Sequence, residues 1–264
     1  MMKVAYLMNG VIGGLSGKNY QCNDIDIQSE IVKYSAATHK YLKSDNVDID
    51  YFIFSWESHL HDTYANVYNP KRLVTADQKI FEVPEHYASQ VNNPRVQSHY
   101  SRWYGCKEVY NLMLDYKKET GIEYDLVINA RLDLCYHMVI DLSQFTGNQF
   151  YIGYYLNAPF YNWPKKNEMC DHFFASSEEN MSRVSKLYDH INEYTKPGQC
   201  PRYELISNHF LIVWHLRKLG LLETNIINEV VSSINNGYGQ NTHYHIFRYQ
   251  NLTKEELLTS NKII

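Results

Sequence analysis

The stretch "YDLVINARLDL", residues 124–134, decides the fold expected for this chain. Its apolar run 126–128 is typical of a buried strand. Arg131 and Asp133 then place two charges where the apolar run would continue. In open α/β sheets, ligands bind beyond the carboxyl ends of the strands. The two charges therefore indicate either a ligand site or a structural ion pair, and their spacing alone does not choose between these alternatives.

The segments around this stretch alternate between strand and helix patterns. In chain order, the predicted elements are strand 3–10, helix 27–43, strands 49–56 and 72–76, helix 97–119, strands 124–134, 149–155 and 172–177, a helix capped by Ser176 that ends near Tyr194, helix 202–219 with His209 on its apolar face, and strand 242–249. This order predicts an α/β fold with a mostly parallel central sheet flanked by helices. No linker divides the chain, so we expect one domain over 1–264.

Composition narrows the classes of function. The formal net charge of −4 gives no electrostatic footprint for non-specific binding to nucleic acid. The five cysteines include no Cys-x-x-Cys pair, which favours reduced thiols. The first ten residues are too short and strand-like for a signal peptide, and no apolar run is long enough to span a bilayer. We therefore expect a cytoplasmic protein, in a bacterial cell or an infected host cell.

The glycine-rich stretch "GVIGGLSGKNY", residues 10–20, does not match a phosphate-binding motif. Three residues separate Gly13 from Gly17, and Asn19 stands where a Walker motif has Ser or Thr. The glycines favour a flexible loop, or a close approach of the backbone to a ligand, over an ATPase site.

Six segments in order, "KVAYLMNG", "DIDYFIFSW", "NPKRL", "QSHYSRWYGCKEVYNLM", "YDLVINARLDL" and "DHFFASS", resemble a family of small glycosyltransferase-like proteins found in surface-glycan loci and large viral genomes. The resemblance covers roughly residues 3–220. It implies a GT-A-like, Rossmann-like domain, in which a D-x-D motif binds a metal ion and the diphosphate of a sugar nucleotide. Here Arg131 stands at the first Asp of that motif and leaves Asp133 alone. The need for Mn²⁺ or Mg²⁺ therefore stays open.

The resemblance also implies which residues bind the donor, a nucleotide sugar expected to be UDP-linked. The candidates are Asn9, Gly10, Ser98, Tyr100, Arg102, Trp103, Arg131 and Asp133. Ser98, Tyr100, Arg102 and Trp103 open the predicted helix 97–119, where they could stack on the base and bind phosphate at the helix amino terminus. Trp103 lies on the apolar face of that helix, so a core position is an equal alternative.

The candidate catalytic carboxylates are Asp133, Asp171 and Glu204. An exposed Asp171 could act as general base or bind acceptor hydroxyls, and the alternative is a turn-forming aspartate. Glu204 opens a helix, where a carboxylate also stabilises the dipole. His243 and His245 alternate on the last predicted strand and could complete a metal site with Asp133, although twelve histidines make a chance pair easy.

The resemblance implies a glycosyltransferase that moves a sugar from the nucleotide donor to an acceptor hydroxyl. We expect residues 1–135 to bind the nucleotide and residues 136–264 to bind the acceptor. The acceptor would be a surface or capsid glycan, or a modified base in viral DNA. The alternative is a nucleotide- or carbohydrate-binding protein that has the same fold and no turnover.

Overall fold

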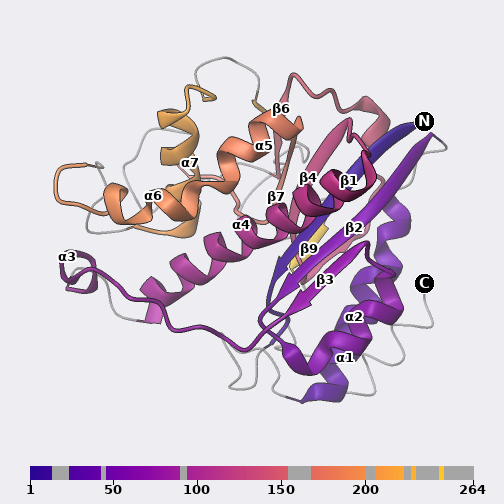
Figure 1. Cartoon of the computed structure of the whole chain (residues 1–264), viewed down its shortest axis with the longest axis horizontal. Helices are drawn as coiled ribbons and strands as arrows, with labels where there is room; N and C mark the ends of the chain where they lie inside the picture. The colour runs from indigo at the N-terminus through magenta and orange to yellow at the C-terminus, as the bar shows by residue number, and fades with distance from the viewer. Residues whose placement is uncertain are drawn as a thin grey trace.

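The computed structural model describes residues 1–13, 24–42, 46–89, 94–153, 168–199, 206–222, 227–229 and 244–246. Its main sheet contains β1 (Met2–Gly10), β2 (Val47–Ser55), β3 (Arg72–Thr75), β4 (Leu126–Arg131), β6 (Phe150–Ile152), β7 (Phe173–Ser176) and β8 (Ile227–Glu229). These seven strands lie in the order β3-β2-β1-β4-β7-β6-β8 (Figure 1). Only β7 runs antiparallel to its neighbours, so the prediction of an α/β fold with a mostly parallel sheet is confirmed.

Helices cover both faces of this sheet (Figure 1). One face carries α1 (Ile25–Thr38) and α2 (His61–Tyr68), and the other carries α4 (Pro94–Thr120), α5 (Glu178–Ser185), α6 (Leu187–Tyr194) and α7 (Asn208–Lys218). Short helices lie at α3 (Glu85–Ala88), η2 (His39–Leu42), η3 (Ser58–Leu60) and η4 (Leu142–Gln144). Among the residues described above, no helix is long and apolar enough to cross a membrane.

The alternation of side chains along β1 divides the interior into two cores. Ala5 and Leu7 pack under α4, whereas Val4, Tyr6 and Met8 pack on the opposite face with α1. All five side chains are fully buried. A strand in the middle of a covered sheet needs apolar residues at every position, which explains why β1 reads as a continuous apolar run.

The stretch 124–134 contains the whole of β4 and the start of a second strand. β4 ends at Arg131, Leu132 and Asp133 form a turn, and β5 (Leu134–Tyr136) leaves the main sheet to pair with β9 (Tyr244–Ile246). The expectation of one strand over 124–134 is therefore wrong at its end. The turn is the reason, because it carries the chain out of the main sheet after Arg131.

Two further predictions need correction. The helix expected from Ser176 to about Tyr194 is two helices, α5 and α6, and its N-cap is Ser177, whose hydroxyl accepts from the backbone nitrogen of Asn180 at 3.3 Å. The sequence also gave no indication of α2, which connects the parallel strands β2 and β3. Parallel neighbours require such a crossover.

A buried imidazole lies inside the core under α1. The rings of Tyr6, Tyr51, Tyr68 and Tyr136 surround His39, with ring centroids 5.0–5.5 Å from its own. His39 is 5% exposed, and its Nδ1 lies 3.1 Å from the Tyr51 hydroxyl. Burial lowers the pKa of His39 from 6.5 to about 3. The folded protein therefore holds this imidazole neutral at pH values where the unfolded chain protonates it.

The stability of the protein is expected to fall as the pH drops from about 6.5 towards 3. Over that range the unfolded chain binds a proton that the folded chain does not, at a cost of up to about 1.4 kcal/mol per pH unit. His215, whose pKa is lowered to about 4 by burial, adds a second contribution. Urea unfolding at pH 7 and pH 5 measures how steeply the free energy of unfolding falls as the pH drops. This slope should be shallower in His39→Phe than in the wild type. An equal slope in the wild type and the variant contradicts the prediction. His61→Gln, at an exposed histidine, is the control.

Candidate functional site

The candidate site lies where the strand order reverses at the carboxyl edge of the sheet. The chain leaves β1 to form β2 and β3 on one side, and returns to form β4 on the other side of β1. In open α/β sheets this switch point is where ligands bind. Asn9 and Arg131 are register partners at the ends of the two strands. β7 enters the sheet at this same edge, so Asp171 and His172 lie beside them.

A buried carboxylate holds the loop that follows β1. Glu57, two residues beyond the end of β2, is fully buried and accepts from the backbone nitrogens of Ile12 and Gly13, both at 2.8 Å. The Tyr64 hydroxyl also donates to Glu57, at 2.8 Å. Gly10 has φ +125°, a conformation that side chains rarely adopt. The first turn of this loop is therefore fixed by hydrogen bonds to Glu57, which is not among the residues predicted from the sequence.

Arg102 connects α4 to the carboxyl edge. Its guanidinium is 7% exposed and donates to the Asn9 side-chain oxygen, and also to the Asp171 backbone carbonyl at 2.5 Å. Arg102 Nε lies 3.4 Å from Asp171 Oδ2. Gly105 makes this reach possible, because a Cβ there would lie 3.3 Å from Asn9 Oδ1. Asn129 from β4 completes the group by accepting from Asn9 Nδ2 at 3.3 Å.

Arg131 and Asp133 pair with each other. Arg131 Nε and Nη2 donate to the two Asp133 oxygens at 2.7 and 2.5 Å. The Asp133 side chain is fully buried, whereas the Arg131 side chain is 23% exposed. Burial opposes the charge on Arg131, but the Asp133 carboxylate outweighs it and raises the pKa of Arg131. Among the described residues, Arg131 Nη1 has no hydrogen-bond partner. Asp133 thus orients a partly exposed guanidinium that keeps Nη1 for another partner.

Asp171 is buried, at 3% exposure, so the exposed carboxylate expected here is wrong. Its Oδ1 lies 3.0 Å from Nδ1 of His209, which α7 supplies, and 3.8 Å from Nε2 of His172. Burial alone would raise the pKa of Asp171, but His209, with help from His172 and Arg102, lowers it well below 3.8. Burial lowers the pKa of His172. The site therefore holds Asp171 as a carboxylate and His172 as a neutral imidazole.

The aromatic residues expected to bind the nucleotide base lie in the core. Trp103 is 1% exposed and stacks on Phe174, which favours the core alternative. Tyr100 is 3% exposed and stacks on Phe81. α4 begins at Pro94 and not at 97, so Ser98 and Tyr100 lie beyond the free N–H groups of its first turn. Arg102, from the same helix, reaches the edge through Asn9 and Asp171.

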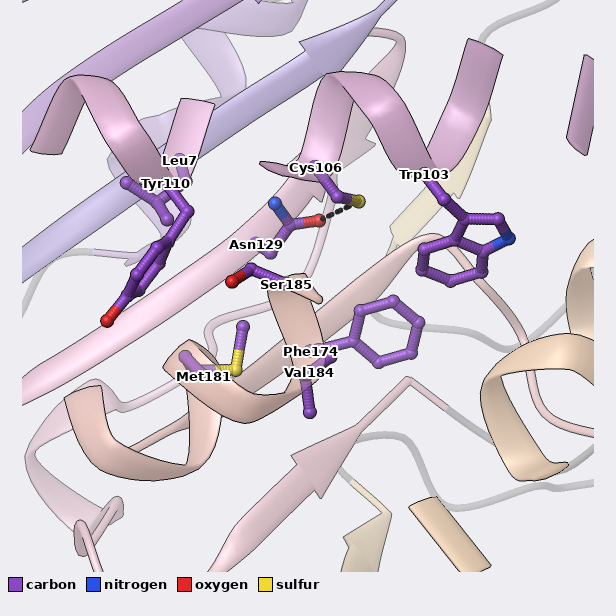
Figure 2. Close-up of a pocket in the computed structure, with 9 residues that line it drawn as sticks. All are labelled: Leu7, Trp103, Cys106, Tyr110, Asn129, Phe174, Met181, Val184 and Ser185. Atoms are coloured by element: carbon purple, nitrogen blue, oxygen red, sulfur yellow. Dashed lines mark hydrogen bonds between the residues drawn. The ribbon is translucent and has the colours of Figure 1, made fainter. Parts of the chain in front are cut away.

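A small cavity lies in the core between α4, α5 and the sheet (Figure 2). Its lining is almost entirely buried and consists of Leu7, Trp103, Cys106, Tyr110, Asn129, Phe174, Met181, Val184 and Ser185. The Cys106 thiol donates to the Asn129 side-chain oxygen at 3.3 Å, as the dashed line in Figure 2 shows. We assign this cavity to core packing under the site, because its walls are mainly apolar and buried.

Of the residues expected to bind a metal ion, Asp133 accepts from Arg131 through both of its oxygens. In the part of the chain that the structure describes, no group of three or more His, Cys, Asp or Glu side chains is arranged to hold a metal ion. His243 and Glu204 lie outside the described residues. The backbone of His245 is described, and it pairs with Cys135 between β9 and β5.

The carboxyl edge therefore combines two arginines, two imidazoles and the backbone turn after Gly10. Arg131, with a side chain 23% exposed, is an accessible cationic donor there, and the His209 imidazole beside it is 33% exposed. Such a set suits an anion with several oxygen acceptors. A scan of the chain against models of known protein families gives no match, and a search among curated proteins gives none either.

Proposed function

We propose that the chain is a nucleotide-sugar-dependent glycosyltransferase that binds the diphosphate of its donor at this edge. The observation that carries the proposal is the orientation of Arg131 by the buried carboxylate of Asp133. A guanidinium held through Nε and Nη2 keeps Nη1 for a ligand oxygen and stays charged at any working pH. The position between β1 and β4, at the switch point of the sheet, supports the same assignment.

Glycosyl transfer requires a cation to stabilise the leaving diphosphate, and a group that takes the proton from the acceptor hydroxyl. Arg131 is suited to the first role. Asn9 and the turn after Gly10 lie next to it, where a backbone without a Cβ allows a phosphate to approach closely. Since Asp133 is occupied by Arg131, we derive no step through a metal ion.

The proposed donor is UDP-linked, and the proposed acceptor is a surface or capsid glycan. A modified base in viral DNA is a second acceptor, disfavoured by the net charge of −4. The proposed setting is the cytoplasm of a bacterium or an infected host. A binding protein without turnover is a second candidate, and the observation that favours it is the pairing of both carboxylates at the edge, Asp133 and Asp171, with arginines.

A thermal-shift panel tests the proposal. UDP, GDP, ADP and CDP are each added with Mn²⁺ and with EDTA, because a ligand that binds only the folded state raises the apparent melting temperature. We expect UDP to give the largest shift and to retain it in EDTA. Release of UDP from a UDP-sugar in parallel samples distinguishes an enzyme from a binding protein. No shift with any of the four nucleotides would contradict the proposal.

Arg131→Lys is expected to weaken UDP binding about 10- to 100-fold while changing the melting temperature of the free protein little. Lysine keeps the charge but loses the planar fork that contacts Asp133 and a phosphate together, a loss of roughly 1.5–3 kcal/mol. Calorimetric titration with UDP measures the affinity. Arg72→Lys, at a partly exposed arginine paired with Glu119, is the matched control. Equal affinity in Arg131→Lys and the wild type would place the diphosphate elsewhere.

A further inference from the structure

An aspartate–histidine pair faces the edge beside Arg131. His209 Nδ1 lies 3.0 Å from Asp171 Oδ1, and the Asp171 backbone N–H points at the same nitrogen from 3.3 Å. The first contact needs a proton on Nδ1 and the second needs its lone pair, so the two compete. The shorter contact, to an ionised carboxylate, is the stronger one and places the proton on Nδ1. Among the described residues, no side chain or backbone group hydrogen-bonds His209 Nε2. The His209 side chain is 33% exposed and that of Asp171 is 4% exposed, so the pair presents only the imidazole to a ligand.

The position of this imidazole is fixed from two sides. Ser207 caps α7 by accepting from the Phe210 backbone nitrogen at 3.1 Å, which places His209 in the first turn. The His209 carbonyl accepts from the Met169 backbone nitrogen at 3.3 Å, which joins α7 to the chain that enters β7. Asp171 itself is held by Arg102. The pair is therefore built by α4, α7 and the turn before β7 together.

We infer that His209 is the general base of the proposed reaction and that Asp171 is its positioning residue. This inference rests on the proposed function and deepens it. A base must hold a free nitrogen towards the acceptor, and Nε2 is the nitrogen that Asp171 leaves free. A carboxylate that binds the opposite ring nitrogen fixes the tautomer and stabilises the imidazolium formed when the base accepts a proton.

The step is a single displacement. His209 Nε2 takes the proton of the acceptor hydroxyl as the acceptor oxygen bonds to the anomeric carbon of the sugar. The bond from that carbon to the diphosphate breaks, and its electron pair stays on the diphosphate, whose charge Arg131 stabilises. The proton on His209 then passes to solvent water. Attack from the face opposite the leaving group inverts the anomeric configuration.

The charges around His209 suit a base that works near neutral pH. Asp171 and Glu168 are the acidic groups that favour its protonation, and Arg131 opposes it. The neighbouring His172 ring, 6.1 Å away between centroids, is held neutral by burial. Burial favours neutral imidazole, but Asp171 outweighs it and raises the pKa of His209 above 6.5. Activity should therefore rise with pH through a single ionisation above 6.5, as neutral His209 accumulates.

Donor hydrolysis, with water as acceptor, tests the inference. UDP-glucose, UDP-galactose, UDP-N-acetylglucosamine and GDP-mannose are supplied to the wild type, His209→Gln and the control His190→Gln, whose imidazole is exposed on α6. We expect His209→Gln to lose at least 100-fold in kcat with UDP affinity unchanged within threefold, and His190→Gln to match the wild type. NMR of the sugar released first should show the inverted anomer.

A second measurement does not depend on the variants. NMR titration of the ¹⁵N-labelled imidazoles gives the pKa of His209 in the wild type, which should match the acid limb of kcat/KM for donor hydrolysis. A His209→Gln activity within threefold of the wild type, a retained anomeric configuration, or a mismatch of the two pKa values overturns the inference and leaves the proposed function standing. Nucleotide binding without hydrolysis of any donor overturns the inference and favours the binding protein. Failure to bind any nucleotide overturns both.

Discussion

Replacing Arg102 with methionine is expected to lower the free energy of unfolding by about 3–5 kcal/mol, the usual cost of removing one partner of a buried ion pair. Arg102 is 7% exposed and faces Asp171, which is 3% exposed. Methionine fills a similar volume and has no donor. The substitution leaves the buried Asp171 carboxylate with His209 as its remaining close cationic partner, and removes the donor to Asn9.

Urea unfolding followed by circular dichroism at pH 7 measures this change. Lys107→Met is the matched control, because Lys107 lies on the same helix and forms a surface ion pair with Asp189, with a side chain 33% exposed. A surface pair contributes at most about 1 kcal/mol. If Arg102→Met and Lys107→Met unfold at the same urea concentration, Arg102 does not hold the carboxyl edge together.

Glu57→Gln is expected to lower the free energy of unfolding by roughly 2–4 kcal/mol. The glutamine NH₂ group would face a donor at a position where a carboxylate oxygen now accepts a hydrogen bond. Glu57 accepts from Ile12 and Gly13 nitrogens and from the Tyr64 hydroxyl, all at 2.8 Å. Glutamine has one acceptor oxygen for these three donors. The turn after β1 should then open more often, and UDP should bind more weakly.

Hydrogen exchange of the amides of Ile12 and Gly13 reports the opening directly, and urea unfolding gives the stability. Glu119→Gln, on the surface at the end of α4 with a side chain 60% exposed, is the control and should leave both measurements unchanged. Unchanged exchange at Ile12 and Gly13 in Glu57→Gln would show that other contacts hold the turn.

The sequence predicted the elements whose apolar pattern was strong. β1, β2, β4 and α4 carry long apolar runs or faces, and their positions were close to those observed. α2 was missed because Tyr64 and Tyr68 are its only buried residues. The antiparallel direction of β7 was not predictable either, since the alternation of side chains is the same in both directions.

The site was predictable where polar residues follow a strand. That pattern pointed to Asn9, Arg131 and Asp133, and the same pattern at the end of β2 could have identified Glu57. His209 was counted on an apolar helix face, and its partner Asp171 is 38 positions away, so nothing local indicates the pair. The sequence could not show whether Trp103 lies in the core or in a binding site, because an aromatic residue on an apolar helix face fits both positions equally well.

The separation of the edge residues along the chain has a consequence for biosynthesis. Arg102 meets Asn9 across 93 positions and Asp171 across 69 positions. A nascent chain that has emerged from the ribosome only as far as β4 contains Arg102 but not yet its partner Asp171. Until Asp171, 69 positions after Arg102, has been synthesised, the Arg102 charge at this edge has no carboxylate partner. The ability to bind a ligand there arises late in synthesis, once α7 has also left the exit tunnel.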